Sequence, residues 1–256
     1  MVKVLLDSPA TGVVVTGGAS GIGLATARAL AAVGRPVALW DINAEGAQAA
    51  AAEIASTFGV AAVGQAVDLR DPQGISPAVA PARAAIGPIG GIVHCAGTAA
   101  ITGLEGITPE NWDAGMALHA RAVVLLTQAF MDDLKANPGS AVVALASINA
   151  TFGNGMIPIY TAAKGAVLSL VRSMADELAP HGVRINTVSP GIIDTPILGE
   201  ARDGMEAAYG RRVLLGRFGQ ADEVARVVRF LLSDEASYVT GAEILVDGGI
   251  LHSQRP

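Results

Sequence analysis

The chain has 256 residues, and its composition is 51% hydrophobic and only 16% charged. A chain of this size buries roughly 75% of the surface that its unfolded form exposes, so it can fold without a metal ion or a disulfide, and its one cysteine, Cys95, excludes an internal disulfide. The net charge of −6 and the absence of any lysine or arginine run exclude the basic surface that nucleic-acid binding requires.

The stretch before Asp7 is too short in apolar residues to be a signal peptide. No uncharged apolar run further along reaches the ~18 residues that span a bilayer. We therefore expect a soluble, cytoplasmic protein that has neither a membrane nor a nucleic acid as a partner.

Short apolar runs rich in valine and isoleucine alternate with longer stretches of helical spacing along the whole chain. The apolar runs predict strands over residues 13–16, 36–41, 61–68, 91–95, 140–147, 183–189 and 243–246. The intervening stretches predict helices over residues 21–33, 44–58, 72–86, 109–135, 158–179 and 221–233.

The predicted strands mostly lack polar alternation, which is typical of parallel strands that helices cover on both faces. Regular alternation of strands and helices predicts an α/β fold with a Rossmann-like, doubly wound sheet of about seven parallel strands. No linker or repeat divides the chain, so residues 1–256 are expected to form one domain for dinucleotide binding and catalysis. Residues 197–212 interrupt the alternation after a strand end, and we interpret the region around residues 194–213 as a substrate lid.

A glycine-rich loop follows the first predicted strand directly and leads into a helix. It reads Thr16-Gly17-Gly18-Ala19-Ser20-Gly21-Ile22-Gly23. Glycines permit the tight turn and let the backbone approach a pyrophosphate, whose charge then meets the helix N-terminus. The spacing differs from the strict GxGxxG pattern, so the loop indicates a dinucleotide site chiefly through its position after the first strand.

Asp41 ends the second predicted strand and lies 24 residues after Gly17, close to the ~20 expected of the acid that binds the adenosine ribose. A carboxylate there favours NAD and repels the extra phosphate of NADP. No arginine or lysine follows the glycine loop to receive that phosphate. A solvated aspartate at a strand end is the alternative interpretation, and the same ambiguity applies to Asp68 after the third strand.

Tyr160 and Lys164 lie four positions apart in a predicted helix, so their side chains share one face. An ammonium beside a phenol favours the phenolate and is expected to lower the tyrosine pKa from ~10. Such a phenol can exchange a proton with an alcohol or carbonyl oxygen. Ser147 ends the preceding strand, and its hydroxyl could hydrogen-bond to that same oxygen.

Taken together, these residues resemble the short-chain dehydrogenase/reductase family over about residues 13–249. The further motifs that carry the resemblance are Asp68, Ala96-Gly97, Asn186, Pro190-Gly191 with Thr195, and the closing stretch Thr240-Gly241 to Asp247-Gly248-Gly249. The resemblance implies hydride transfer between a secondary alcohol or ketone and a nicotinamide cofactor, with NAD preferred over NADP and no metal required.

The resemblance also implies a role for each matching residue. Tyr160 would be the general acid/base, Ser147 would orient the substrate oxygen, and Lys164 would bind the nicotinamide ribose and lower the tyrosine pKa. Asp41 would hold the adenosine ribose and Asp68 would lie near the adenine. Gly17, Gly21 and Ile22 would line the pyrophosphate site, and Ile193 and Thr195 would meet the carboxamide. The remaining implied cofactor contacts are Ser20, Leu69, Ala96, Gly97, Pro190 and Gly191.

Two histidines depart from the family pattern. His94-Cys95 replaces the usual Asn-Asn before Ala96-Gly97, and we interpret His94 as a structural replacement and Cys95 as a small buried filler. His119 stands seven positions after Trp112, where the family usually has an asparagine that helps hold a relay water. A neutral imidazole can also hold a water, and it can titrate near neutral pH. His119 is therefore a candidate member of the proton relay, with simple helix packing as the alternative.

The substrate is expected to be a small or medium, largely uncharged alcohol or ketone. The residues expected to shape its pocket are Asn149, Thr151, Met156 and Ile157, with the lid. Apart from the lid arginines Arg202, Arg211 and Arg212, they offer no charge for a carboxylate. Two alternatives stay open: a 3-oxoacyl-thioester reductase using NAD(P)H, and a non-catalytic NAD-binding regulator. The last predicted strand and the family habit suggest a homotetramer or homodimer.

Overall fold

The structure is a computed structural model that describes residues 8–201, 204–205 and 209–254. A sheet of seven parallel strands runs in the order β3-β2-β1-β4-β5-β6-β9, which confirms the predicted doubly wound architecture. Its strands are β1 (Gly12–Thr16), β2 (Val37–Asp41), β3 (Ala62–Ala66), β4 (Ile89–His94), β5 (Ala141–Leu145), β6 (Arg184–Pro190) and β9 (Glu243–Val246).

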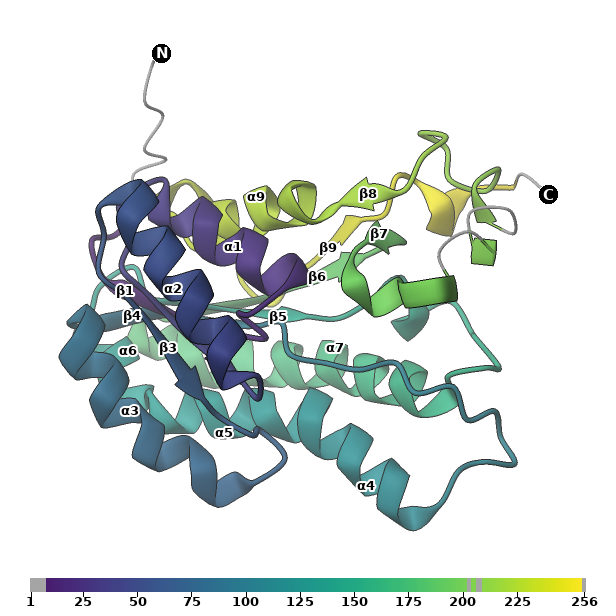
Figure 1. The fold of residues 1–256 in the computed structure, drawn as a ribbon, viewed down its shortest axis with the longest axis horizontal. Helices are drawn as coiled ribbons and strands as arrows, with labels where there is room; N and C mark the ends of the chain where they lie inside the picture. Colours follow the sequence, from purple (N-terminus) through teal and green to yellow (C-terminus); the bar gives the residue numbers. More distant parts are fainter. Residues whose placement is uncertain (1–7, 202–203, 206–208, 255–256) are drawn as a thin grey trace.

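Helices cover both faces of this sheet (Figure 1). On one face lie α1 (Gly21–Ala31), α2 (Ala44–Phe58) and α9 (Ala221–Leu231). On the other lie α3 (Pro72–Ile86), α4 (Pro109–Met116), α5 (Ala122–Ala129), α6 (Met131–Ala136) and α7 (Pro158–Leu178). Within the described ranges, none of these helices combines the length and the apolar character that a membrane crossing needs.

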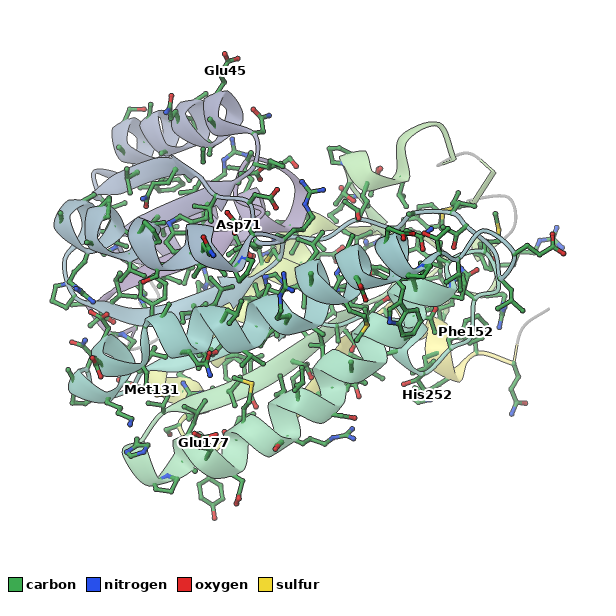
Figure 2. All side chains as sticks on the ribbon, turned by 90° about the horizontal axis from the view of Figure 1, so that it is seen from below. Glu45, Asp71, Met131, Phe152, Glu177 and His252 are labelled. Atoms are coloured by element: carbon green, nitrogen blue, oxygen red, sulfur yellow. The ribbon has the colours of Figure 1, made fainter. Side chains whose placement is uncertain are left out.

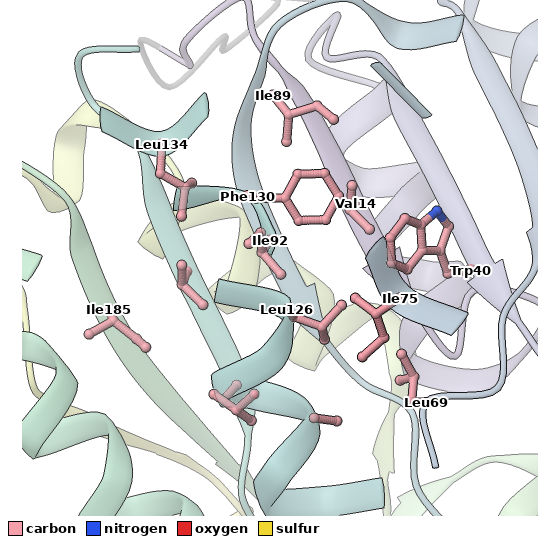
Figure 3. Packing of buried hydrophobic residues seen from close by; sticks show 14 of the residues in the cluster. Val14, Trp40, Leu69, Ile75, Ile89, Ile92, Leu126, Phe130, Leu134 and Ile185 are labelled. Carbon is pink, nitrogen blue, oxygen red and sulfur yellow. The ribbon is translucent and has the colours of Figure 1, made fainter. Parts of the chain in front are cut away.

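Each strand of the sheet centre contributes side chains to two separate cores, which is why its sequence shows no polar alternation. In β1, Val14 faces the core beneath α3, α5 and α7, whereas Val13 and Val15 face the core beneath α1, α2 and α9. In the first core the rings of Trp40 and Phe130 pack at 5.5 Å between centroids with a tilt of 43° (Figure 3). Burial on both faces therefore fixes β1 in the middle of the sheet.

The carboxyl ends of all strands meet at one edge of the sheet because the strands are parallel. The strand order reverses between β1 and β4, so the connections that leave these two strands diverge to opposite faces and open a crevice. Figure 2 shows Phe152, which follows β5, at the same end of the molecule as His252, and Met131 and Glu177 at the other end. The first end is where a ligand site is expected.

The single helix predicted over residues 109–135 is wrong in detail. After α4 the chain forms a π-helical turn, η1 (Ala117–Arg121), before α5 begins, and the helix breaks again at Phe130, whose φ of −107° and ψ of 10° are not helical. In η1 the carbonyl of Leu118 accepts a hydrogen bond at 3.0 Å from the buried ring of His94. Hydrophobic spacing continues through both breaks, so periodicity alone does not reveal them.

The region predicted as a lid does interrupt the alternation. It contains a short 3-10 helix, η4 (Pro196–Ala201). Strand β7 (Ile193–Asp194) at its start pairs with β8 (Gly219–Gln220) after it, and this two-stranded sheet is too short for sequence patterns to predict. Val213, at the end of the region, packs with Ile148 and Ile250 in a small third core. Arg202 lies outside the described residues.

Two buried arginines hold the C-terminal end of α9 against the amino ends of the strands. The guanidinium of Arg35, only 1% exposed, donates to the carbonyls of Thr11 and Leu232, each at 2.9 Å. Arg184 donates at 2.8 Å to the carbonyl of Leu231. The last carbonyls of a helix lack intrahelical partners, so these side chains satisfy acceptors that would otherwise be buried unpaired.

Replacing Arg35 by methionine tests this clamp. Arg35→Met should lower the free energy of unfolding by about 3 kcal/mol, because two buried carbonyls lose their donor. The measurement is urea unfolding at equilibrium. Arg28→Met is the matched control, since Arg28 makes an exposed ion pair with Glu53, and its loss should change stability by no more than about 0.5 kcal/mol. Equal, small effects of both changes would contradict the clamp.

Candidate active site

A cleft of about 640 Å³ opens at the carboxyl ends of the strands, across the point where the strand order reverses. It is lined by the ends of β1, β2, β3 and β4 with the loops that follow them, by one face of α4 and η1, and by the start of α7. The predicted cofactor and catalytic residues that line it are Gly17, Ser20, Gly21, Ile22, Asp41, Asp68, Leu69, Ala96, Gly97, His119, Tyr160 and Thr195. Residues as far apart in the sequence as Gly17 and Thr195 thus line one cleft.

The glycine loop has the shape of a cradle for a pyrophosphate. Gly17 has a φ of +66°, and a Cβ there would lie 2.9 Å from the backbone of Ala96. A Cβ on Gly23 would lie 2.1 Å from the carbonyl oxygen of Gly17. Helix α1 begins at Gly21, and Ser20 makes no side-chain capping bond to it. Its first N–H groups therefore remain available to an anion, which fits a dinucleotide.

Asp41, the last residue of β2, is held in place by backbone hydrogen bonds. One carboxylate oxygen accepts from the backbone N–H of Ala19 at 3.1 Å, and the other accepts from that of Asn43 at 2.9 Å. Each carboxylate oxygen has a second lone pair, so the group can still accept from a sugar hydroxyl. The negative charge is thus held in the cleft by the backbone of the glycine loop.

Arg70 is a cleft residue that the sequence analysis missed. Its guanidinium forms a forked ion pair with Asp68, with N···O distances of 2.7 to 3.2 Å. The arginine holds the pKa of the Asp68 carboxyl below its usual value, mainly through this hydrogen bonding. Asp68 therefore lines the cleft as one half of an ion pair. In the sequence, the spacing of two residues between Asp68 and Arg70 was the only sign of this pair.

Tyr160 lies in the first turns of α7 and faces the cleft. The Ser147 side chain beside it lowers the tyrosine pKa in part, but burial has the larger effect and raises the pKa above its usual value. Ser147 also accepts from the backbone N–H of Asn149 at 3.1 Å, and at 6% exposure it does not line the cleft itself. The expectation of a lowered tyrosine pKa is thus wrong.

Lys164 lies beside the Tyr160 ring and hydrogen-bonds to the backbone at the end of β5. Its ammonium lies 5.5 Å from the centre of the Tyr160 ring and donates to the carbonyl of Leu145 at 2.5 Å, at the end of β5. Lys164 is only 3% exposed, and this burial lowers its own pKa to about 8. Tyr160, Ser147 and Lys164 nevertheless form one contiguous group, as their spacing predicts.

His119 lies in η1 and packs its ring edge-on against the ring of Tyr160, with 5.3 Å between centroids and 88° between planes. Its Nε2 donates to the carbonyl of Thr98 at 3.0 Å, whereas its buried Nδ1 has no partner. Burial, with the charges of Lys164 and His94, lowers the pKa of His119 to about 2. The predicted titration near neutral pH is therefore wrong, and the ring stays neutral.

His94 is buried as expected, whereas Cys95, expected to be a buried filler, is only partly buried and lines the cleft. The His94 ring accepts from the hydroxyl of Thr16 at 2.9 Å through Nδ1 and donates to Leu118 through Nε2, and burial lowers its pKa to about 3. Burial raises the pKa of the Cys95 thiol to about 12, so it remains protonated. Neither group is suited to proton transfer at neutral pH.

Several expected site residues do not line the cleft. Pro190, Gly191 and Ile193 lie at the end of β6 and in the segment after it, and a Cβ on Gly191 would lie 2.7 Å from the Cα of Asp247. The expected pocket residues Asn149, Met156 and Ile157 also lie off the lining, and Met156 is an exposed residue whose carbonyl accepts from Thr102 and Gly103. From the predicted lid, Pro196 and Ile197 do line the cleft. The cleft residues that were not predicted include Trp40, Ile42, Thr98, Asn111, Ala114, Gly115, Leu118 and Ile159.

The face of α4 is the largest part of the cleft that sequence reasoning missed. Gly115 lies inside this helix, and a Cβ there would lie 2.5 Å from a methyl carbon of Ile159 at the start of α7. Glycine in a helix interior costs about 1 kcal/mol relative to alanine, so it commonly marks a close approach of another element. Gly115 was thus the signal that α4 and α7 meet at the cleft.

The buried ammonium of Lys164 predicts a pH-dependent stability. Its pKa is about 8 in the folded protein against 10.5 for an unperturbed lysine. The unfolded chain binds more protons between these values, so the free energy of unfolding should rise with pH across that window, by about 3 kcal/mol relative to Lys164→Met. Chemical denaturation across the window measures the difference. Lys135→Met, an exposed lysine, should keep the wild-type pH dependence; a constant difference between the wild type and Lys164→Met would contradict the prediction.

Comparison with known proteins agrees with this geometry. Residues 17–251 match the family model described as Enoyl-(Acyl carrier protein) reductase. An uncharacterized short-chain type dehydrogenase/reductase of Sinorhizobium fredii is 36% identical over 243 residues, which cover 93% of this chain and 96% of that protein. Cyclohexanol dehydrogenase of an Acinetobacter species is 38% identical over 235 residues, which cover 91% and 92%.

Among solved structures, L-sorbose reductase from Gluconobacter frateurii, in complex with NADPH and L-sorbose, superposes with a TM-score of 0.89 and 30% identity. The match covers 96% of this chain and 99% of that protein. The match to the family model over nearly the whole chain, the level of identity and the cleft with its Ser147, Tyr160 and Lys164 group agree with one another. The chain belongs to the short-chain dehydrogenase/reductase family and is an oxidoreductase of alcohol and ketone substrates.

Proposed function

We propose that the protein interconverts a secondary alcohol and a ketone with NAD as its cofactor, and that Tyr160 is the acid–base group. The observation that carries the proposal is the contact of Tyr160 with both Ser147 and Lys164 at one end of a cleft whose other end has a glycine cradle and Asp41. A cofactor site and a proton-transfer group are thus joined in one cavity. A nicotinamide bound there would supply the carbon that accepts or donates hydride.

The side chains of the catalytic end divide the proton chemistry between them. Ser147 donates a hydrogen bond to the substrate oxygen, and Tyr160 removes the hydroxyl proton of an alcohol or returns it to a ketone. The ammonium of Lys164 favours the phenolate against the effect of burial, and charge interactions are stronger in this buried site than in water. The buried Nδ1 of neutral His119 has no partner and is the atom through which any relay water would have to be held.

The cofactor would extend from the glycine cradle to Tyr160. Gly17, Ser20, Gly21 and Ile22 would bind the pyrophosphate. The adenosine end would rest near Asp41, Asp68 and Leu69, and the nicotinamide end near Ala96, Gly97 and Thr195, with Pro190, Gly191 and Ile193 as the support beneath. NAD is preferred over NADP because the fixed carboxylate of Asp41 would repel a phosphate on the adenosine ribose.

The substrate is a largely uncharged alcohol or ketone. Around Tyr160 the described cleft lining is apolar or neutral, whereas its charged side chains lie at the adenosine end. Ile197, an exposed apolar residue, is one of the lining residues. The described lid arginine Arg212 stacks on the ring of Phe152 at 4.8 Å, off the cleft lining. A carboxylate or phosphate on the substrate would thus find no cation among the described lining residues near Tyr160.

A 3-oxoacyl-thioester reductase is the second candidate. The description of the matching family model, which names an acyl carrier protein substrate, favours it. Asp41 counts against the NADPH that such a reductase would be expected to use. Substrate competition with a short 3-oxoacyl thioester against an uncharged ketone distinguishes the two candidates.

Self-association is the remaining part of the proposal. Strand β9 forms one edge of the sheet and leaves Ile244 and Val246 only partly buried, so a second copy can cover them. We expect a homotetramer, or a homodimer, in the cytoplasm.

Removing the phenolic hydroxyl tests the acid–base role. Tyr160→Phe should lower kcat/KM for a secondary alcohol by about 10²- to 10⁴-fold, because the proton acceptor is lost. Its dissociation constant for NADH, measured by fluorescence titration, should stay close to that of the wild type. Tyr238→Phe, at a fully exposed tyrosine, is the control and should keep the wild-type rate. Wild-type turnover in Tyr160→Phe would contradict the acid–base role, whereas NADH binding without any turnover in the wild type would support a non-catalytic NAD-binding regulator.

Neutralising Asp41 tests the cofactor preference. Asp41→Asn should lower the ratio of kcat/KM for NAD to that for NADP by at least about tenfold, because the like-charge repulsion disappears. Steady-state rates with each cofactor measure the ratio. Glu45→Gln removes an exposed charge near the start of α2, and it should leave the ratio unchanged. An unchanged ratio in Asp41→Asn would contradict the assignment.

A further inference from the structure

Two buried imidazole rings connect η1 to the strand end that forms the floor of the cleft. His119 donates through Nε2 to the carbonyl of Thr98 at 3.0 Å. His94 donates through Nε2 to the carbonyl of Leu118 in η1, also at 3.0 Å. The bonds run in opposite directions, one from η1 to the loop after β4 and one from β4 to η1. Both rings are 1% exposed, so water does not compete for these bonds.

The same rings restrict the position of the backbone at residues 96–98. The Nδ1 of His94 accepts from the hydroxyl of Thr16, whose oxygen accepts in turn from the backbone N–H of Ala96 at 3.3 Å. A Cβ on Gly97 would lie 2.6 Å from Cε1 of His119, so the imidazole packs directly on the backbone there. Residues 96–98 are therefore held at both ends and have no room to shift toward the ring.

This segment lies between the two halves of the site. On one side, a Cβ on Gly17 would lie 2.9 Å from the backbone of Ala96, so the glycine cradle rests against it. On the other side, the ring of His119 stands edge-on against the ring of Tyr160, 5.3 Å away between centroids. The spacing between cradle and phenol is thus transmitted through Ala96, Gly97 and His119.

We propose that His94 and His119 form a histidine clasp, in which their Nε2–H groups hold residues 96–98 against η1 and so position Tyr160 relative to the cofactor cradle. Both are positioning residues in this role. The inference rests on the function proposed above. It assigns the contribution of His119 to Nε2, which is bonded in the structure, and not to its unpartnered Nδ1.

Substitution by amide side chains distinguishes the roles of the two ring nitrogens of His119. A glutamine amide reaches about as far as Nε2 and can still donate to the Thr98 carbonyl, whereas an asparagine amide ends near the place of Nδ1. A clasp predicts recovery by glutamine, and a relay water held at Nδ1 alone predicts recovery by asparagine.

The experiment compares His119→Ala, His119→Gln and His119→Asn. His119→Ala should lower kcat by about 10- to 100-fold, because misplacement by about 1 Å is enough for such a loss. It should also weaken NADH binding several-fold and lower the melting temperature. His119→Gln should restore most of all three quantities, and His119→Asn should resemble His119→Ala. His181→Gln, at an exposed histidine after α7, controls for the loss of an imidazole as such and should match the wild type.

Three results would overturn the clasp: recovery by His119→Asn, failure of His119→Gln to recover any of the losses, or wild-type behaviour of His119→Ala. A second variant, His94→Ala, should weaken NADH binding as His119→Ala does, and the double variant should lose less than the product of the two single losses. NADH affinity and melting temperature need no turnover. If the wild type oxidises no alcohol, the proposed function fails, yet these two measurements still decide the clasp.

Discussion

The site depends on one constraint: β1 and β4 are neighbours in the sheet, but the chain leaves them toward opposite faces. No helix can cover the gap between these connections, so a crevice remains at the strand ends. The backbones of Gly17 and Ala96 pack against each other at these strand ends, so closely that a side chain on Gly17 would not fit. The end of the cleft proposed for the adenosine is lined from β2 and β3, and the end that holds Tyr160 is lined from α4, η1 and α7.

Burial has two opposing effects on the catalytic group. It raises the pKa of Tyr160 and lowers that of Lys164 to about 8, so it disfavours the charged form of each. The same low-dielectric surroundings strengthen every charge interaction and hydrogen bond inside the site. In the proposed mechanism, proton exchange at the tyrosine therefore depends on how closely Lys164 and Ser147 are held to it, so their rigid support would be part of the chemistry. That support comes from β5, whose end carries Ser147 and the carbonyl that Lys164 binds.

Much of this arrangement was predictable from the sequence because it follows from local spacing. The glycine loop, Asp41 at a strand end, and Tyr160 four positions before Lys164 each combine a residue type with a position in a strand or helix. The expected helix over residues 109–135 was interrupted because η1 is a tertiary feature, in which a carbonyl pairs with a distant histidine. The pKa of His119 was mispredicted for a similar reason, since burial depends on packing that spacing does not reveal.

The pocket residues were the least predictable part. Asn149, Met156 and Ile157 follow a strand end, as ligand residues commonly do, but the path of their loop turns them away from the described lining. Arg70 was missed because a surface arginine becomes a cleft residue only through its pairing with Asp68. Loop paths and long side chains are set by contacts between segments far apart in the chain, and one sequence does not specify them.

The central claim is that the protein is an NAD-dependent dehydrogenase of uncharged secondary alcohols. The most direct test is to measure initial rates of the purified wild type with NAD and with NADP. The panel of secondary alcohols should range from cyclic, apolar ones to ones that carry a carboxylate. We expect turnover of the uncharged alcohols, with NAD clearly preferred, and little turnover of the carboxylates. Turnover confined to NADP, or no oxidation of any alcohol and no reduction of the matching ketones, would contradict the account.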